Sequence, residues 1–199
     1  MIKKYCFHLC LVMVALLSSK SSFAQLEVTD YLNVPGPVLF GNTNYFLAWS
    51  SRPVDNYYKQ EYLAKGDSLE HFSKLVLIDV LEDTIKPKEL VLLKLKDLKE
   101  RKKTDAVVNY NLIQSPDSTE YIVDFVESEG VPKTDFVEWN AYLYKAFKDI
   151  NGHKGVMLFG ISIRSYGNTA ADFFGSLRDL REHIINQLIA YTVPQVNIQ

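Results

Sequence analysis

The sequence predicts a single α+β domain built on a central antiparallel sheet of about six strands that helices cover. Four strand-like segments follow one another in the second half of the chain, and the turns between them are too short for parallel crossovers. A long amphipathic segment follows the last strand and predicts a C-terminal helix packed on the sheet. Two shorter helix-like segments precede the four strands.

The last third of the chain contains the clearest elements. Gly155–Arg164 is mainly apolar, which predicts a buried strand. Thr169 with Asp172 three residues later resembles a capping box, and Pro194 follows the predicted helix end near Tyr191. Between them, the apolar residues recur at the spacing of one helix face: Phe173, Phe174, Leu177, Leu180, Ile184, Ile185 and Leu188.

Further strand-like segments complete the predicted sheet. They are Val38–Phe40, Asn44–Trp49, Tyr57–Leu63, Ala106–Ile113, Glu120–Val126 and Phe136–Phe147. The last of these alternates apolar residues with polar ones such as Glu138 and Asn140, so its two faces differ. Asn151-Gly152 is the strongest hairpin signal in the chain and pairs this strand with Gly155–Arg164.

Two helices are predicted between the first and second groups of strands. Asp67 with Glu70 three residues later forms a capping box, and an apolar face follows at Leu69, Phe72, Leu75 and Val76. Pro87, a common first-turn residue, opens the second helix, which ends in the charged run Lys99–Lys103. Its apolar residues, which form a face wider than one stripe, are Leu90, Leu92, Leu93, Leu95 and Leu98.

Residues 1–24 have the pattern of a secretory signal peptide, and the predicted domain spans residues 25–199. Two lysines precede a mainly apolar run, Tyr5–Leu17, and the small residues Ser22 and Ala24 fit cleavage after Ala24. An uncleaved membrane anchor is the alternative, although the apolar run is short for a span of about 20 residues. The pattern predicts an exported protein, periplasmic or extracellular, with no stable membrane anchor after cleavage.

The composition excludes several classes of function. Both cysteines, Cys6 and Cys10, lie in the predicted signal, so the remaining chain has neither disulfides nor thiol chemistry. Loss of the three lysines in the signal leaves 19 basic and 24 acidic residues, a net charge of −5. Nucleic acids and anionic membranes bind clustered positive charge, so neither is a predicted partner.

The sequence contains no recognisable catalytic or cofactor motif. Ser162 lies within a predicted strand, and Arg164 stands where a nucleophile elbow has its second glycine. His71, His153 and His183 form no metal-binding pair on one helix face. The glycines match neither a phosphate loop nor a dinucleotide fingerprint. The sequence therefore predicts no cofactor and no metal.

One group of polar residues lies in otherwise apolar strands and forms the candidate ligand-binding site: Arg164, Asp124, Asn140 and Tyr144. A charged side chain inside a sheet must be paired or solvated. One interpretation is a cross-strand ion pair of Arg164 with Asp124 or Glu138. A second is a concave sheet face that binds an anionic or peptide ligand, with Arg164 as its anchor. A third is a partner surface, because tyrosine and tryptophan dominate protein interfaces.

The order of the predicted elements resembles that of the PsbP/Mog1-like fold families, through Tyr58–Leu77, Asn109–Phe125 and Gly155–Leu188. The resemblance covers most of the chain after the signal and includes no diagnostic motif. It implies a central antiparallel sheet covered by helices. Members of these families include assembly factors of photosystem II and a regulator of a small GTPase, so the resemblance implies a binding protein more than an enzyme.

The sequence thus predicts an exported binding protein without catalytic activity. The first hypothesis is a protein-interaction or assembly module of the cell envelope that binds an envelope protein through the aromatic residues of the sheet. The second is a carrier of a small anionic ligand near Arg164. The third is a hydrolase without a recognisable motif.

Overall fold

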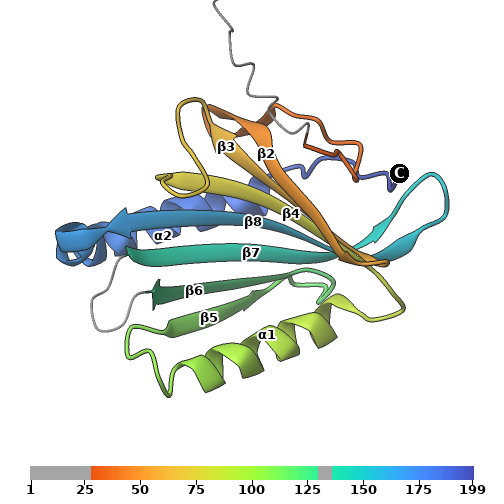
Figure 1. The fold of residues 1–199 in the computed structure, drawn as a ribbon. Helices are drawn as coiled ribbons and strands as arrows, with labels where there is room; N and C mark the ends of the chain where they lie inside the picture. The colour runs from red at the N-terminus through yellow and green to blue at the C-terminus, as the bar shows by residue number, and fades with distance from the viewer. Residues whose placement is uncertain (1–27, 130–135) are drawn as a thin grey trace, which may run out of the picture.

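The computed structural model describes residues 28–129 and 136–199, and the predicted signal peptide, residues 1–24, lies outside them. The described chain forms eight β-strands and two α-helices (Figure 1). The strands are β1 (Val38–Phe40), β2 (Thr43–Val54), β3 (Tyr57–Ala64), β4 (Lys74–Glu82), β5 (Asn109–Gln114), β6 (Tyr121–Glu129), β7 (Phe136–Lys148) and β8 (Lys154–Tyr166). The helices are α1 (Pro87–Arg101) and α2 (Ala170–Ala190), and a 3-10 turn, Gly167–Thr169, precedes α2.

All eight described strands form one antiparallel sheet with the order β1-β2-β3-β4-β8-β7-β6-β5. It consists of two four-stranded meanders, β1–β4 and β5–β8, which meet where β4 pairs with β8. The sheet curls into a half-barrel (Figure 1). The meander predicted for the second half of the chain is confirmed, and so is the hairpin at Asn151-Gly152 between β7 and β8.

The predicted fold class, a sheet of about six strands covered by helices, is wrong. The described chain is mostly sheet, with 45% of it in strands and 22% in helices. The predicted count of strands was too low because one segment that resembles a helix, the region after Asp67, forms a central strand instead. The helices cover less than predicted, since α1 packs mainly on the part of the sheet formed by β5, β6 and β7.

The described residues after Asp67 contain a turn and a strand, not the predicted helix. Ser68 and His71 exchange backbone hydrogen bonds of 3.1 Å, and the chain then enters β4 at Lys74. Between Leu75 and Leu81, β4 is apolar except for Asp79, and it is buried on both faces. A strand buried on both faces lacks the alternating pattern that identifies a half-exposed strand, which is why the helical spacing of its first residues was misleading.

Alternate residues of the central strands face two different layers. On one face, α2 packs through Ile184, Ile185 and Leu188 in the largest apolar core. The strands contribute alternate residues to this core, including Val76, Ile78, Trp139, Ala141, Phe159 and Ile161. In Figure 1, α2 lies behind β8. The long C-terminal helix predicted from the sequence is confirmed, and its apolar stripe faces this core.

The segments at both ends of the described chain extend the same core. Leu32, Val196 and Ile198 are buried there. The Asn197 N–H donates a hydrogen bond of 2.9 Å to the Leu32 carbonyl, so the C-terminal tail lies beside the N-terminal segment. The Leu32 N–H in turn donates to Oε1 of Gln60, a fully buried residue of β3, at 2.9 Å. These bonds attach both segments to the sheet.

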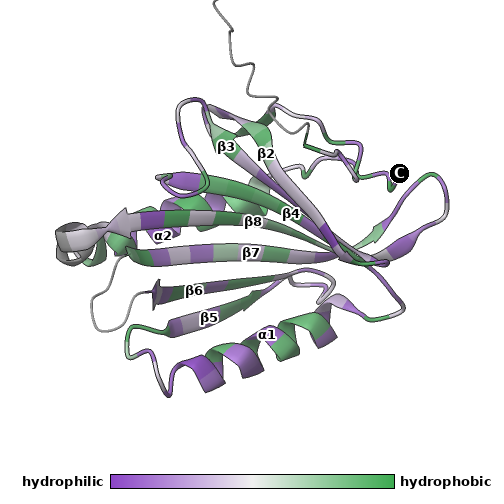
Figure 2. Cartoon of the chain, viewed as in Figure 1, coloured by the Kyte–Doolittle hydropathy of each residue, from purple (hydrophilic) through white to green (hydrophobic). Residues whose placement is uncertain are grey.

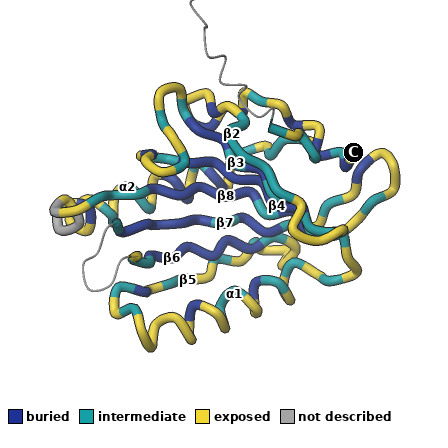
Figure 3. Tube along the Cα trace, viewed as in Figure 1, coloured by how far each residue is buried: buried dark blue, intermediate teal, exposed yellow. Residues whose placement is uncertain are grey.

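The opposite face of the sheet is contacted by α1, which begins at Pro87 as predicted. Val91 and Leu98 of α1 are buried against Val123 and Phe125 of β6. A neighbouring stripe of the helix faces a cavity instead: Leu90, Leu93, Lys94 and Asp97. Two adjacent stripes with different neighbours explain why the apolar face of this helix is wide. In Figure 3 the outward side of α1 is exposed, and in Figure 2 the helix carries both polar and apolar residues.

Candidate functional site: a cavity beneath α1

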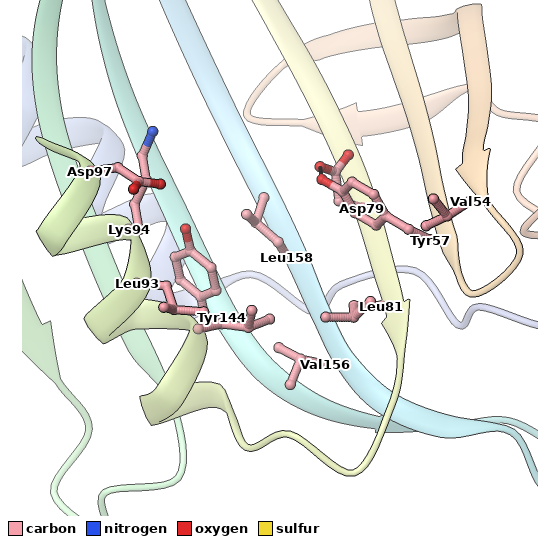
Figure 4. A pocket seen from close by; sticks show the side chains of 11 residues that line it. Val54, Tyr57, Asp79, Leu81, Leu93, Lys94, Asp97, Tyr144, Val156 and Leu158 are labelled. Carbon is pink, nitrogen blue, oxygen red and sulfur yellow. Dashed lines mark hydrogen bonds between the residues drawn. The ribbon is translucent and has the colours of Figure 1, made fainter. Parts of the chain in front are cut away.

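A cavity of about 360 Å³ lies on the face of the sheet that α1 contacts (Figure 4). The helix forms one wall, and Val54 of β2 and Tyr57 of β3 stand on the opposite side. The floor consists of side chains from β4, β8 and β7. The cavity therefore lies where α1 leaves the sheet uncovered, over the junction of the two meanders.

The register of the strands places the floor residues. Leu158 of β8 pairs with Asp79 of β4 on one side and with Tyr144 of β7 on the other. Two residues along, Leu81 of β4 pairs with Val156 of β8. Because side chains of a strand alternate between the faces, all five point to the same side. In Figure 4, Leu81 and Val156 lie together at one end, and the polar ends of Asp79 and Tyr144 point toward the other.

Asp79 provides a buried carboxyl group, with 8% of the residue exposed. The Tyr57 hydroxyl donates to Asp79 Oδ2 at 2.6 Å, and Lys59 Nζ lies 3.8 Å from the same oxygen. Oδ1 has no hydrogen-bond partner among the described residues. Burial raises the pKa of Asp79, and the Lys59 charge and the Tyr57 hydrogen bond offset this only in part. The cavity thus contains a carboxyl group whose bonding is incomplete.

Lys94 provides a largely desolvated amine on the α1 wall. It forms no ion pair with a carboxylate of the described residues. Its Nζ lies 4.1 Å from the centre of the Phe125 ring and 5.7 Å from that of Tyr142. Burial lowers the pKa of Lys94, and the charges of Glu127 and Asp97 oppose this effect. The aromatic rings stabilise the ammonium but do not neutralise its charge.

Tyr57 and Tyr144 carry the hydroxyl groups of the cavity. Burial raises the pKa of both phenols, and the charge of Asp79 raises them further. Both hydroxyls therefore stay protonated at neutral pH and are able to donate hydrogen bonds. The Tyr144 hydroxyl lies on the same side of the cavity as Lys94 in Figure 4.

Gly160, two residues after Leu158 in β8, lets its cross-strand neighbours approach the strand closely. A Cβ atom at this position would lie 2.8 Å from both Leu77 Cγ and Tyr142 Cδ1. The absence of a side chain lets Leu77 and Tyr142 approach each other over the strand, since they pair with Gly160 from either side. These two side chains stand between the cavity and the polar residues farther along β8, Ser162 and Arg164.

The structure brings together three of the four predicted site residues on one face, but only Tyr144 lines the cavity. Asn140 pairs with Ser162 of β8 on the same face. It is fully buried, and its Oδ1 accepts hydrogen bonds from the hydroxyls of Ser162 and Tyr142. Asn140 therefore joins β7 to β8 and does not contact the cavity.

Arg164 is already engaged by neighbouring side chains. Its Nε and Nη2 donate to Glu138 Oε2 at 2.8 and 2.7 Å, so the cross-strand pair with Glu138 is present. The guanidinium also lies between the rings of Phe72 and Phe136, with its central carbon 4.2 and 3.8 Å from their centres. The side chain is 17% exposed. An anion would have to compete with Glu138 for this guanidinium.

Asp124 points to the other face of the sheet. Arg181 of α2 donates to both of its carboxylate oxygens, at 2.5 and 2.8 Å, which fixes the helix to β6. A cavity of about 460 Å³ borders this pair and also contacts Asn109 and Asn111 of β5. Because the two charged groups neutralise each other, this second cavity presents no unsatisfied charge. Asp124 and Glu138, which occupy neighbouring strands, do not share a face.

The described residues show no arrangement typical of metal or nucleophilic catalysis. They contain no group of three or more His, Cys, Asp and Glu residues able to hold a metal ion. His153 Nδ1 lies 2.7 Å from Asp149 Oδ2, and the His71 ring stacks on Tyr166 with centres 4.1 Å apart. As for membrane insertion, no described helix is both long enough and apolar enough to span a bilayer.

Tyr57, Asp79, Lys94 and Asp97 were not among the site residues predicted from the sequence. Asp79 had a visible signal, because it is the one charged residue in the apolar run Leu75–Leu81. A charge in such a run needs a specific reason. Lys94 and Asp97 gave no such signal in the sequence, since a lysine and an aspartate on an amphipathic helix are ordinarily solvent-facing.

Comparisons with known proteins place the chain in a family. No curated protein and no solved structure matches it. The resemblance to the PsbP/Mog1-like families stays a prediction. A protein-family model matches residues 32–193, a range that includes every residue of the cavity beneath α1. The chain therefore belongs to the family that this model represents.

Proposed function

We propose that the protein is an exported binding protein that holds a small molecule in the cavity beneath α1. The observation that carries this proposal is the combination, in a cavity of about 360 Å³, of an apolar floor with the buried and incompletely bonded carboxyl group of Asp79. Small-ligand sites are typically cavities of this size, mostly apolar and with a few polar groups that orient the ligand.

Apolar residues at the rim support a ligand with a hydrophobic part. Val54 on one side is 56% exposed, and Leu93 on the other is 52% exposed. Contact with a ligand would remove this surface from water, which stabilises a complex by about 25 cal/mol for each Å² of apolar surface buried. The rim therefore favours binding of a molecule that is partly apolar.

The proposed position differs from the one expected near Arg164. That guanidinium is paired with Glu138 and enclosed by two rings, so it has little capacity left for an anion. The cavity beneath α1 offers charged groups with fewer partners, Asp79 and Lys94. The role of Arg164 as a ligand anchor stays a prediction without support from its contacts.

A role as an assembly module through sheet tyrosines has less support. Tyr45, Tyr58, Tyr62 and Tyr121 are all buried. Their rings stabilise the core and are not presented to a partner protein. Nor do the contacts favour a hydrolase, because Ser162 Oγ donates to Asn140, with no histidine bonded to it among the described residues. Binding without catalysis is therefore the function that we propose.

Native mass spectrometry of the protein, expressed from its full sequence in an exporting host, tests the proposal. We expect a bound small molecule in the native spectrum that is lost on denaturation. The mass of the denatured chain then reports export as well, because removal of the signal leaves a chain that begins at Gln25.

Two leucine substitutions test whether the molecule binds in this cavity: one alters the cavity, and the other is its matched control. Leu158→Trp places a large ring in the floor of the cavity and should abolish retention of the molecule. Leu92→Trp adds the same ring on the outward side of α1, where Leu92 is 55% exposed, and should leave retention unchanged. Equal retention by both variants would contradict binding in this cavity, and circular dichroism verifies that each variant is folded.

A further inference from the structure

Strand β5 is the last strand at one edge of the described sheet (Figure 1) and pairs only with β6. Its register with β6 is constant from Asn109 to Gln114. The hydrogen bond from the Ser115 N–H to the Glu120 carbonyl, which continues this register, shows which residues of the ladder are bonded. Bonded and non-bonded residues alternate in an antiparallel pair, so every second residue of β5 directs its N–H and C=O away from β6.

The outward-directed residues of β5 are Tyr110, Leu112 and Gln114. Their backbone N–H and C=O groups have no hydrogen-bond partner in the part of the chain that the structure describes. Leu112, in the middle of the three, is 40% exposed. Its side chain lies on the α1 side of the sheet, because it pairs with Val123, which packs in the core beneath α1. The edge of β5 is therefore accessible to another strand.

The sequence of β5 lacks the features that protect an exposed edge. Proteins protect such edges with charged side chains, proline, bulges or very short strands. The six residues of β5, Asn-Tyr-Asn-Leu-Ile-Gln, include neither a charge nor a proline, and their pairing with β6 has no bulge. At the opposite edge, β1 has three residues and directly follows Pro37. Of the two edges of the described sheet, β5 is thus the one suited to pairing.

The charge distribution favours a second copy of the chain as the partner. The chain has 24 acidic and 22 basic residues, so copies of it repel each other where acidic surfaces meet. Residues 106–116, which contain β5, include no charged side chain. Two copies therefore approach each other along β5 without placing like charges in contact.

We propose that the protein forms a dimer by antiparallel pairing of β5 with the β5 of a second copy. A two-fold axis at Leu112 places this residue opposite its own counterpart and Tyr110 opposite Gln114 of the other copy. Each of these three pairs exchanges two hydrogen bonds, so six bonds use all the outward-directed N–H and C=O groups of both strands. The two Leu112 side chains lie next to each other and are removed from water.

This pairing closes after two copies. The same strand is used on both sides, so the interface is isologous and occupies the open edge of each copy. The edges that remain are the two β1 strands, which are short and follow a proline. A contact limited to one strand is smaller than the interfaces of stable complexes, so we expect a dissociation constant in the micromolar range. No residue of β5 lines the cavity beneath α1, so the dimer is independent of the proposed ligand.

Sedimentation velocity of the purified protein over a wide range of concentrations tests the proposal. We expect a single reversible step from monomer to dimer as the concentration rises through the micromolar range. A protein that stays monomeric throughout, whether or not a peptide occupies its edge, overturns the proposal. Growth of larger assemblies beyond the dimer overturns it as well, because the pairing closes.

Charge substitutions at the proposed axis provide the sharper test. Leu112→Lys and Leu112→Glu each place like charges directly opposite each other and should weaken the dimer roughly tenfold. A mixture of the two variants should associate again, because opposite charges then face each other. Leu39→Lys is the matched control, since Leu39 is a 56% exposed leucine of the other edge strand, and it should leave dimer formation unchanged.

The variants also define what contradicts the pairing. Unchanged dimer formation by Leu112→Lys, or an equal loss in Leu39→Lys, places the interface elsewhere. If each Leu112 variant is monomeric but their mixture stays monomeric too, Leu112 does not lie opposite itself and the two-fold pairing is wrong. Circular dichroism verifies that each variant is folded.

Discussion

Asp79 weakens the fold at the position where it supplies the proposed site with a charge. It is a buried acid in the centre of the sheet, and burial raises its pKa above the ordinary value. A raised pKa means that the folded state holds the proton more tightly than the unfolded state. The ionised form therefore costs folding free energy at neutral pH.

We predict that Asp79→Asn stabilises the protein in the absence of ligand. Asparagine has nearly the same shape, and its Oδ1 still accepts the Tyr57 hydrogen bond, but it carries no charge. The gain should be small near pH 4, where the unfolded aspartate is protonated in part, and should grow as pH rises through the raised folded pKa. Urea unfolding at a series of pH values measures it.

Asp55→Asn, at an exposed position, is the control and should change the free energy of unfolding little at any pH. A less stable Asp79→Asn protein at neutral pH would show that the carboxylate is better compensated than its contacts indicate. Greater stability together with loss of ligand binding would mark Asp79 as a residue whose value lies in binding.

Alternation along a strand placed predicted site residues on a face only where the strand has two contrasting faces. The alternation in β7 placed Asn140 and Tyr144 on one face, and the structure confirms that placement. The alternation did not indicate the face on which Asp124 lies, because the side of β6 that packs on α2 depends on the pairing of the whole sheet. Asp79 could not be predicted because its strand is buried on both faces and the first residues of that strand have helical spacing.

At the scale of elements, the β7–β8 hairpin is tied to the C-terminal tail by one side chain. Asp149 accepts hydrogen bonds from the His153 ring, 2.7 Å, the His153 N–H, 2.8 Å, and the Ile198 N–H, 3.2 Å. Burial alone would raise the pKa of Asp149, but these bonds outweigh it and lower the pKa. The bond to Asp149 raises the pKa of His153, which burial opposes.

We predict a pH-dependent contribution of this pair to stability. The His153 contribution is fully present below the unfolded pKa of about 6.5 and is lost as pH rises through the raised folded value. The Asp149 contribution is present above its unfolded pKa of about 3.9 and is lost as pH falls through the lowered folded value. Wild type should therefore exceed His153→Gln in unfolding free energy by more at about pH 5 than at about pH 9.

Asp149→Asn supplies the check on this mechanism. In an Asp149→Asn background, the His153→Gln substitution should have the same effect at both pH values, because the partner charge is gone. A pH dependence that survives in this background would assign the effect to another group.

Elements were predictable where short-range signals decide them. Pro87 at the start of α1, Asn151-Gly152 in the hairpin and the apolar stripe of α2 all gave correct elements. The capping box predicted at Thr169 is not formed, since Thr169 makes no side-chain cap and its hydroxyl donates to the Tyr166 carbonyl. The failure at Asp67 has a similar cause, because a capping pattern begins a helix only when the following residues have no better place in a sheet.

At the scale of the whole molecule, the C-terminal tail completes the apolar core on which α2 packs. Val196 and Ile198 are buried beside the N-terminal segment. We predict that ending the chain after Gln195 lowers the free energy of unfolding by roughly 3 kcal/mol or more, since burial of one aliphatic side chain contributes about 1.5 to 3 kcal/mol. Urea unfolding monitored by tryptophan fluorescence measures the loss.

Removal of Gln199 alone is the control for this truncation. It deletes two exposed hydrogen bonds, from the Gln199 N–H to the Tyr31 carbonyl and from the Gln199 side-chain amide to Asn33 Oδ1, and should cost only about 1 to 2 kcal/mol. If truncation after Gln195 lowers the free energy of unfolding no more than removal of Gln199 does, the tail covers the core without stabilising it.

The curled shape of the whole sheet could not be predicted from the sequence. Each meander follows from its short turns, but the pairing of β4 with β8 joins segments that are distant in the chain, and local patterns contain no record of that pairing. The cavity forms over this junction. Its existence was therefore predictable only after the junction was known, although the polar residues of β7 already pointed to the correct face.

The route of the chain around the cavity has a consequence for how such proteins diversify. The floor of the cavity includes β4, which ends at Glu82, and one wall is α1, which begins at Pro87. A single surface loop, residues 83–86, therefore connects the floor directly to the α1 wall. Insertions or deletions in surface loops are tolerated far better than changes in a core. Lengthening this loop would move α1 outward and enlarge the cavity while every sheet residue stays in place. Members of the family thus have an evolutionary path to a larger or smaller cavity that leaves the scaffold unaltered.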